Sequence, residues 1–259
     1  SVQLARLREI FDDPLLLPGP RGMRPTARAD ELREPLQHAL AAIQKVIAPS
    51  STFNPALANQ HWNIAAFDYG AMTILEPALA MLRTAAPATR IAVVHTLPSQ
   101  VARKAEQGEI DLAFMTGDEA PVNLHRRTLF TERYVLAGRA GHPHLHSPLS
   151  LEEFCQLEHA IVSPEGGGFH GVTDTALAER GMTRRVSLSV PNFLLLSAVL
   201  KSTDLVAMVP WRLVCENDAL QITESPVEVP GFEMVMLWPE RVHRDPAHQW
   251  LRERIACSI

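Results

Sequence analysis

The chain has 259 residues, 46% of them hydrophobic, and carries a formal net charge of -5 at pH 7. That length suits one composite domain or two lobes, and the hydrophobic fraction allows a sizeable core. The negative balance argues against nonspecific nucleic-acid binding by the chain as a whole, although it is compatible with a local basic patch.

Targeting and redox features predict a cytoplasmic protein. No apolar run approaches the roughly 20 residues of a membrane span, and no basic-then-apolar signal segment opens the sequence. The three cysteines, Cys155, Cys215 and Cys257, are scattered and odd in number. This usage is typical of a reducing compartment and provides neither a disulfide framework nor a CxxC metal site.

The first segment indicates a helix followed by a small hairpin. Apolar residues recur at helical spacing over Ser1–Phe11, and Asp12–Pro14 ends the helix, because a proline disfavours helical geometry in the residue before it. Leu15–Leu17 and Met23–Thr26 are short β-like runs on either side of a turn at Pro18–Gly22. A helix and an arginine-tipped hairpin in this order are typical of the second half of a winged helix-turn-helix.

A long helix follows, over Ala27–Ile47, for which Thr26 is a suitable N-cap. Pro35 should bend this helix or remove one of its hydrogen bonds. One apolar stripe runs along it, formed by Leu32, Leu36, Ala39, Leu40, Ile43 and Ile47. Such a stripe must be buried, and we expect it to pack on its copy in a dimer; the alternative is packing on its own chain. Residues 48–60 form a linker.

The central stretch, residues 61–115, alternates β-rich and helical patterns. Apolar runs at Ile64–Phe67, Arg90–Val94 and Ile110–Met115 predict three strands. Between them the spacing predicts helices over Ala71–Leu82, kinked by the proline inside it, and Val101–Gln107, ended by a glycine C-cap. This order predicts a parallel sheet with helices on its faces, and ligands of such sheets bind beyond the carboxyl ends of the strands.

The second half of the chain continues the α/β pattern. We expect further strands at residues 123–130, 132–138, 160–163, 185–190, 204–209 and 231–238. The expected helices are residues 151–154, 172–180, 193–200 and 245–256. Glycines at 166–168 precede one of these helices and could present backbone amides to an anion. They lack the Gly-Lys-Ser/Thr ending of a P-loop and the spacing of a dinucleotide turn.

Several motifs together resemble the LysR-type transcriptional regulators. They are LARLREIFDDPLL, RGMRPTARA, VPNFLLLSAVLKSTDLVAMVP and the final WPERVHRDPAHQWLR. The resemblance covers essentially the whole chain and is nearest to the nodulation regulators and the salicylate- or nitroaromatic-responsive regulators. It implies an α/β, two-lobed, periplasmic-binding-protein-like effector domain. A linker helix and the C-terminal remnant of a winged helix-turn-helix would precede that domain.

The resemblance also implies a domain plan. Residues 1–26 would be the end of the recognition helix and the wing, 27–48 the linker and dimerisation helix, and 59–259 the effector-binding domain. Within the last, lobe I would be 59–138 with 234–259, and lobe II 139–233. In the family the first half of the winged helix precedes the residue that matches Ser1, so most base-reading positions would lie upstream.

Four remaining residues are candidates for DNA binding. Ser1 and Gln3 could reach the major groove, while Arg6 and Arg24 could reach phosphates. A solvated surface is the alternative for each arginine. The wing also carries Pro18 where the family commonly has a basic residue. The full-length protein would bind promoter DNA as a homodimer or homotetramer.

The expected effector site lies in the cleft between the lobes. Its candidate residues are Phe67, Asp68, Tyr69, Met72, Pro98, Ser99, Ser163, His170, Asn192 and Phe193. They offer aromatic walls, neutral polar groups and one imidazole, which suits a small planar effector with a carboxylate or phenol. Asp68 argues against a bare carboxylate beside it. Core packing is the alternative for Phe67 and Phe193, and loop bracing is the alternative for His170.

Other chemistries are weakly supported. Three histidines at His142, His144 and His146 could alternate on one side of a strand, but Pro143 and its neighbours favour a turn, so no metal and no cofactor are expected. The sequence lacks GxSxG, HExxH and P-loop patterns, which argues against an enzyme. A solute-binding protein or a cleft enzyme on the same two-lobed fold remains the alternative to a regulator that senses a small aromatic molecule.

Overall fold

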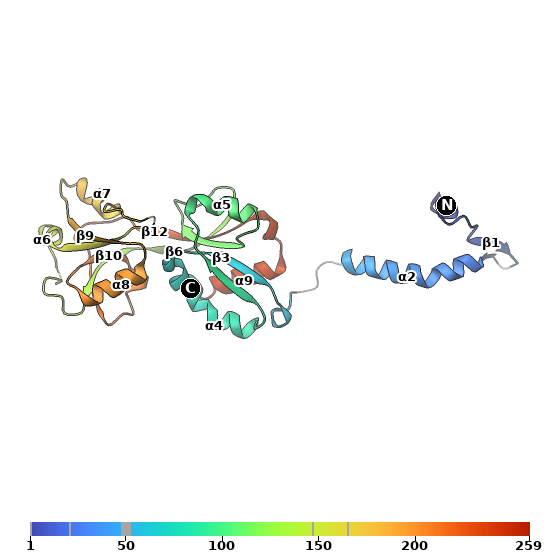
Figure 1. Cartoon of the computed structure of the whole chain (residues 1–259), viewed down its shortest axis with the longest axis horizontal. Coiled ribbons are helices and arrows are strands. Elements are labelled where there is room, and N and C mark those ends of the chain that lie inside the picture. Colours follow the sequence, from blue (N-terminus) through green and yellow to red (C-terminus); the bar gives the residue numbers. More distant parts are fainter. Residues whose placement is uncertain (1, 21, 48–52, 147, 165) are drawn as a thin grey trace. The chain divides into compact units, whose positions relative to one another are not determined.

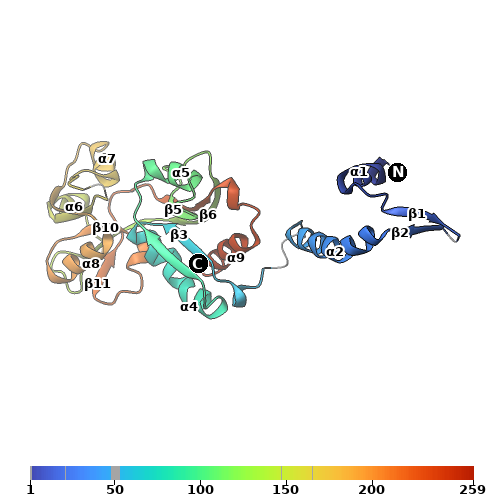
Figure 2. The same ribbon diagram turned by 45° about the vertical axis from the view of Figure 1, so that its right-hand side comes forward.

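The computed structural model describes residues 2–20, 22–47, 53–146, 148–164 and 166–259, and the side chains of residues 45–47 fall outside the description. The chain divides into two compact units, Ser1–Thr52 and Phe53–Ile259. Figure 1 labels their elements, and Figure 2 shows the same ribbon turned by 45°. Among the described residues, no helix is long and apolar enough to cross a membrane.

The first unit consists of two helices and a hairpin, as predicted. Helix α1 (Val2–Phe11) leads to strands β1 (Leu16–Gly19) and β2 (Gly22–Pro25), which pair antiparallel. Helix α2 spans Ala27–Ile47 with a proline in its interior. Thr26 caps α2, because its hydroxyl oxygen accepts the N–H of Ala29 at 3.1 Å.

Asp13 ties the hairpin to the start of α2. One carboxylate oxygen of Asp13 accepts both the Thr26 hydroxyl and the N–H of Leu15, each at 2.6 Å. The guanidinium of Arg8 donates to the carbonyl oxygens of Pro14, at 2.7 Å, and Leu16, at 3.3 Å. Hydrogen bonds therefore connect the segment Asp12–Pro14, after α1, to the segment Arg24–Thr26, before α2.

Lobe I of the second unit contains a five-stranded sheet in the order β4-β3-β5-β12-β6. Its strands are β3 (His61–Ala65), β4 (Arg90–Val94), β5 (Leu112–Thr116), β6 (His125–Glu132) and β12 (Phe232–Trp238). Strand β3 runs parallel to β4 and β5, as predicted, while β12 runs antiparallel to β5 and β6. The last strand therefore returns from the second lobe into the middle of this sheet.

The helices of lobe I cover both faces of the sheet (Figure 1). Helices α4 (Glu76–Ala85) and α9 (Pro246–Ala256) share one buried cluster with Leu112 and Phe114, and α5 (Pro98–Glu106) packs on Ala113 and Met115. Because successive side chains of β5 point to opposite faces of the sheet, this one strand contributes to the hydrophobic core on each face. Gly108 follows α5 with φ +77, the left-handed conformation expected of a C-cap glycine.

The first helix of this lobe differs from the prediction. It begins at Asp68, with α3 (Asp68–Gly70), then a π-helical turn η2 (Ala71–Leu75), and only then α4. The three segments form one unbroken helical run, so Pro77 lies inside it, directly after the π turn, and provides no backbone N–H to the helix. The predicted interruption at Pro77 coincides with this π turn, whereas the predicted start at Ala71 was wrong by three residues.

Lobe II contains two small sheets. Strand β7 (Tyr134–Arg139) pairs antiparallel with β10 (Ala207–Pro210) and with β11 (Leu220–Thr223), a strand that the sequence pattern did not predict. Strands β8 (Glu158–Val162) and β9 (Arg185–Val190) pair in parallel. A bridge between His159 and Val206 joins the two sheets.

The remaining helical elements are distributed over both lobes. They are η1 (Pro55–Leu57), α6 (Leu151–Gln156), α7 (Val172–Ala178), α8 (Phe193–Ser202), η3 (Trp211–Leu213) and η4 (Glu240–Val242). The predicted Ser150 cap of α6 is present as a capping box with Glu153. The chain first passes between the lobes at Arg133, between β6 and β7, whereas the expected boundary was residue 138. It passes back between β11 and β12.

Candidate functional site

A cavity of about 460 Å³ lies between the two lobes, at the carboxyl ends of β3 and β5. Aromatic side chains from both lobes line it: Phe67, Tyr69, Phe114, Tyr134, Phe193 and Phe232. The start of α5 contributes Pro98. This volume is within the range of small-molecule pockets, about 300–1,000 Å³. The cavity therefore has the size and the walls for a small flat molecule.

The charged groups of this cleft are acidic, and its other polar groups are hydroxyls. Asp68, Asp118 and Glu119 line it, and none of the described lining residues is lysine, arginine or histidine. A carboxylate oxygen of Glu119 accepts the hydroxyl of Thr116 at 3.0 Å. Asp68 accepts the backbone N–H of Leu194 in α8 at 2.9 Å, a hydrogen bond from lobe I to lobe II. The charged groups among the described lining residues are therefore all negative.

Tyr69 connects the cleft to the strands that cross between the lobes. Its hydroxyl donates to Glu132 at 2.6 Å, and Glu132 also accepts the N–H groups of Arg133, at 2.8 Å, and Arg212, at 3.3 Å. Burial, with the Glu132 carboxylate beside it, raises the pKa of Tyr69 far above its ordinary value. Tyr69 therefore stays protonated and acts as a hydrogen-bond donor at neutral pH.

Sequence patterns did not identify Glu132 as a residue of the site, and the structure shows that it is almost fully buried, with 3% of its surface exposed. The signal available was an acidic residue between two β-rich runs, in LFTERYVLAG. A Cβ placed on Gly231 would lie 2.2 Å from the Glu132 carbonyl oxygen, so the two crossing segments meet where only glycine fits. Burial also raises the pKa of Tyr134, beside this carboxylate, to about 12.

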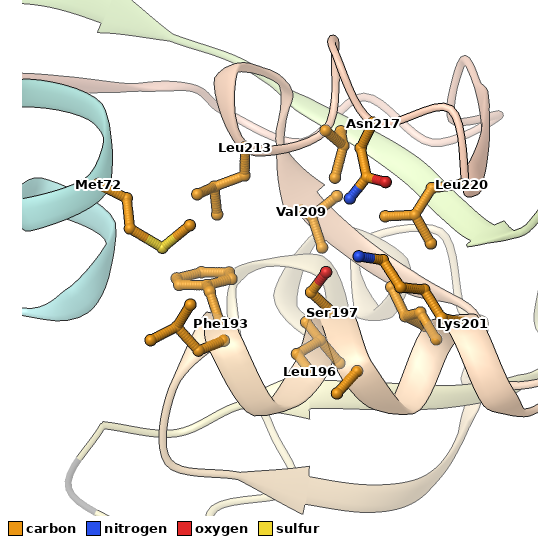
Figure 3. Close-up of a pocket in the computed structure, with 13 residues that line it drawn as sticks. Met72, Phe193, Leu196, Ser197, Lys201, Val209, Leu213, Asn217 and Leu220 are labelled. Carbon is orange, nitrogen blue, oxygen red and sulfur yellow. The ribbon is translucent and has the colours of Figure 1, made fainter. Parts of the chain in front are cut away.

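The structure brings five of the candidate effector residues into the cleft: Phe67, Asp68, Tyr69, Pro98 and Phe193. Met72 instead lines a second cavity, in which Phe193 also takes part (Figure 3). The remaining candidates do not line the cleft. Their roles as ligand contacts stay predictions.

Local hydrogen bonds account for two of the remaining candidates. The Ser163 hydroxyl accepts the N–H of Gly168 at 3.1 Å, and the Asn192 side chain caps α8 by accepting the N–H of Leu195 at 2.9 Å. Ser99 and His170 are exposed. His170 lies in the loop before α7.

In the first unit, the candidate DNA contacts Gln3, Arg6 and Arg24 are all exposed, and Ser1 lies outside the described residues. Gln3 and Arg6 belong to α1, and Arg24 belongs to β2. Their contacts with DNA stay predictions.

His142 and His144 form a turn. The Nε2–H of His142 donates to the carbonyl oxygen of Asp204 at 2.9 Å, and its Nδ1 accepts the N–H of His144 at 3.2 Å. His146 is exposed, with Nδ1 at 3.1 Å from the carbonyl oxygen of Pro148. No group of three possible metal ligands occurs within the part of the chain that the structure describes.

A two-lobed α/β domain with an aromatic cleft between the lobes is an architecture suited to binding small molecules. Residues 56–258 match the family described as LysR substrate binding domain. The chain is 34% identical over 256 residues to the HTH-type transcriptional activator NagR of Ralstonia sp, which covers 98% of this chain and 85% of that protein.

Two further comparisons agree. The chain is 37% identical over 266 residues to the HTH-type transcriptional regulator SyrM 1 of Sinorhizobium fredii, covering 100% of this chain and 76% of that protein. The solved structure of the probable transcriptional regulator PA0477 from Pseudomonas aeruginosa has a TM-score of 0.69 and 29% identity, covering 98% of this chain and 86% of that one. The chain therefore belongs to the LysR-type transcriptional regulators and is not an enzyme.

Proposed function

We propose that this LysR-type regulator senses a small aromatic molecule, neutral or positively charged, in the cleft between its lobes. The observation that carries the proposal is the ring-lined cavity whose described charged residues are all acidic. Aromatic rings pack on a planar ligand, and carboxylates accept hydrogen bonds from phenol, amide or ammonium groups. A free carboxylate on the ligand would face Asp68, Asp118 and Glu119 and be disfavoured.

The ligand would act by changing the balance between arrangements of the lobes. Two hydrogen bonds cross between the lobes beside the cleft. The backbone N–H of Leu194 donates to Asp68, and the backbone N–H of Arg212 donates to Glu132. A molecule that contacts rings from both lobes stabilises the arrangement it fits best. Effector occupancy and promoter binding would then be linked through that equilibrium.

DNA binding and self-association belong to the same proposal. The apolar stripe of α2 is exposed in its own unit, with Leu36, Leu40 and Ile43 each between 44% and 56% exposed. A second copy of α2 would cover it. In the full-length protein, Gln3, Arg6 and Arg24 would contribute contacts to promoter DNA beside those of the rest of the winged helix-turn-helix.

A charge-matched ligand series tests the proposed effector class. The purified 259-residue chain is titrated with benzylamine, benzamide and benzoate, which share one ring and differ in charge, and thermal stability is followed. We expect a saturable rise in Tm with benzylamine or benzamide and a weaker or absent rise with benzoate.

Matched variants locate the site in that experiment. Phe67→Ala should weaken the binding about tenfold, since one lost aromatic contact costs on the order of 1 kcal/mol. Phe169→Ala, which removes an exposed ring outside the cleft, should leave the binding unchanged. The proposal would be rejected if benzoate bound more tightly than benzylamine and benzamide, or if Phe67→Ala and Phe169→Ala changed the binding equally.

A further inference from the structure

A second cavity, of about 350 Å³, lies mainly in lobe II. Helix α8 forms one wall, and the end of β10, η3 and the loop leading to β11 form the other (Figure 3). Buried apolar side chains, among them Leu196, Leu200 and Val209, line its interior. Its volume is within the range of small-molecule sites.

The two ends of this cavity differ in chemistry. Figure 3 shows Met72, Phe193 and Leu213 at one end. Lys201 and Asn217 lie toward the other end and Ser197 lies between the two ends, with the Lys201 nitrogen and the Ser197 oxygen facing the space opposite α8. A molecule that fills both ends must be apolar along its body and polar at one terminus.

The polar end offers hydrogen-bond donors without an opposing acid. Lys201 is the one charged residue among the described lining residues, and no described carboxylate pairs with it. The side-chain oxygen of Asn217 already accepts the N–H of Ala219 at 3.3 Å, which leaves its NH₂ group for the cavity. An ammonium, an amide NH₂ and a hydroxyl together select an anion.

The distance between the ends sets the length of that molecule. Phe193 and Lys201 are eight residues apart on α8, which corresponds to about 12 Å along a helix. We propose that this cavity is a second ligand site, which binds a medium-chain carboxylate with its chain against Met72 and Phe193 and its carboxylate on Lys201. The acidic cleft between the lobes and this cavity would thus take ligands of different charge.

Phe193 gives the two sites a common wall. It lines both cavities, and its ring lies 6.0 Å from the ring of Tyr69. A ligand that moves or holds this ring in one cavity changes the shape of the other. Occupancy of either site should therefore alter affinity at the other by the same factor.

Isothermal titration calorimetry of the whole chain with octanoate tests the site, at concentrations below micelle formation. We expect saturable binding of one octanoate per chain, and at least tenfold weaker binding of octan-1-ol, which has the same chain without the charge. Lys201→Met keeps the length of the side chain and removes its charge. It should weaken octanoate binding about 10- to 100-fold, as expected for loss of a charge-assisted hydrogen bond.

Control variants distinguish binding at Lys201, which is exposed, from binding at another lysine and from binding in the cleft between the lobes. Lys104→Met removes a lysine from α5, in the other lobe, and should leave octanoate affinity unchanged. Phe67→Ala alters the cleft and should likewise leave octanoate affinity within about twofold. Ser197→Phe fills the second cavity and should abolish binding while the far-ultraviolet circular dichroism stays that of the parent chain.

Three results would overturn the second site. They are the absence of saturable octanoate binding, equal affinity for octanoate and octan-1-ol, and loss of binding in Phe67→Ala but not in Lys201→Met. The last would place octanoate in the cleft and would count against the proposed charge preference there as well. If Lys201→Met does not weaken octanoate binding while the cleft variants behave as expected, only the second site is rejected and the proposed aromatic effector of the cleft is unaffected.

Discussion

His159 and His248 are buried in different lobes but are held by the same hydrogen-bond pattern. The Nε2–H group of each donates to a backbone carbonyl, of Phe154 and Asp111 respectively, at 2.9 Å. Each Nδ1 accepts an arginine N–H, at 3.4 Å in His159 and 2.6 Å in His248. Burial lowers the pKa of both to about 4, and the neighbouring arginine contributes to this lowering.

This pattern predicts acid sensitivity of the fold. An unfolded histidine has a pKa of about 6.5, so between pH 6.5 and pH 4 the unfolded chain binds protons that the folded chain does not. The free energy of unfolding should fall by about 1 to 1.5 kcal/mol for each histidine between about pH 7.5 and 5.5, measured by urea denaturation. His248→Gln should lessen this dependence, and exposed His61→Gln should not. Equal slopes in all three chains would contradict the prediction.

Glu132 carries a second prediction at the residue scale. Its carboxylate accepts three hydrogen bonds, and in Glu132→Gln the NH₂ group must face at least one of the same donors. We expect a loss of about 1–3 kcal/mol in the free energy of unfolding, the cost of an unmatched buried polar group. Glu233→Gln, an exposed neighbour on β12, is the control. Equal urea midpoints would show that Glu132 is dispensable.

Among the elements, α2 depends on the residue that caps it. Thr26→Ala removes both the cap on Ala29 and the partner of Asp13, and we expect a loss of about 1 kcal/mol of helix stability. Hydrogen exchange followed by mass spectrometry should show faster exchange in the first turn of α2. Thr26→Ser keeps the hydroxyl and should exchange like the parent chain. Unchanged exchange in Thr26→Ala would mean that the cap contributes little.

For the assembled protein, the proposed dimer depends on the stripe of α2. Leu36→Glu combined with Leu40→Glu places charges in the expected interface, and sedimentation velocity at micromolar concentration should change from dimer to monomer. His38→Glu, on another face of the same helix, is the control and should stay dimeric. If the double variant sediments like the parent chain, the association uses another surface.

Much of this architecture was predictable from local patterns. Hydrophobic periodicity, the Thr26 cap and turn residues predicted α2 from Ala27, the hairpin before it and the parallel strands β3, β4 and β5. Each of these signals lies within a few residues of the element that it predicts. The strand ends also predicted the edge of the sheet at which Phe67, Asp68 and Pro98 meet. The helix start at Asp68 was missed, because an Asp-Tyr-Gly sequence after a strand is typical of a turn.

Motifs and periodicity were enough to specify the family, the order of the elements and the aromatic character of the cleft. Which groups meet across the chain followed only from the packing of the folded lobes. Tyr69 and Glu132 are 63 residues apart, and their hydrogen bond exists because two crossing segments pack beside the first helix. Lys201 and Asn217 share a cavity because β11 returns next to β7. Periodicity records which residues are buried, whereas the partner of a buried polar group depends on how distant segments pack.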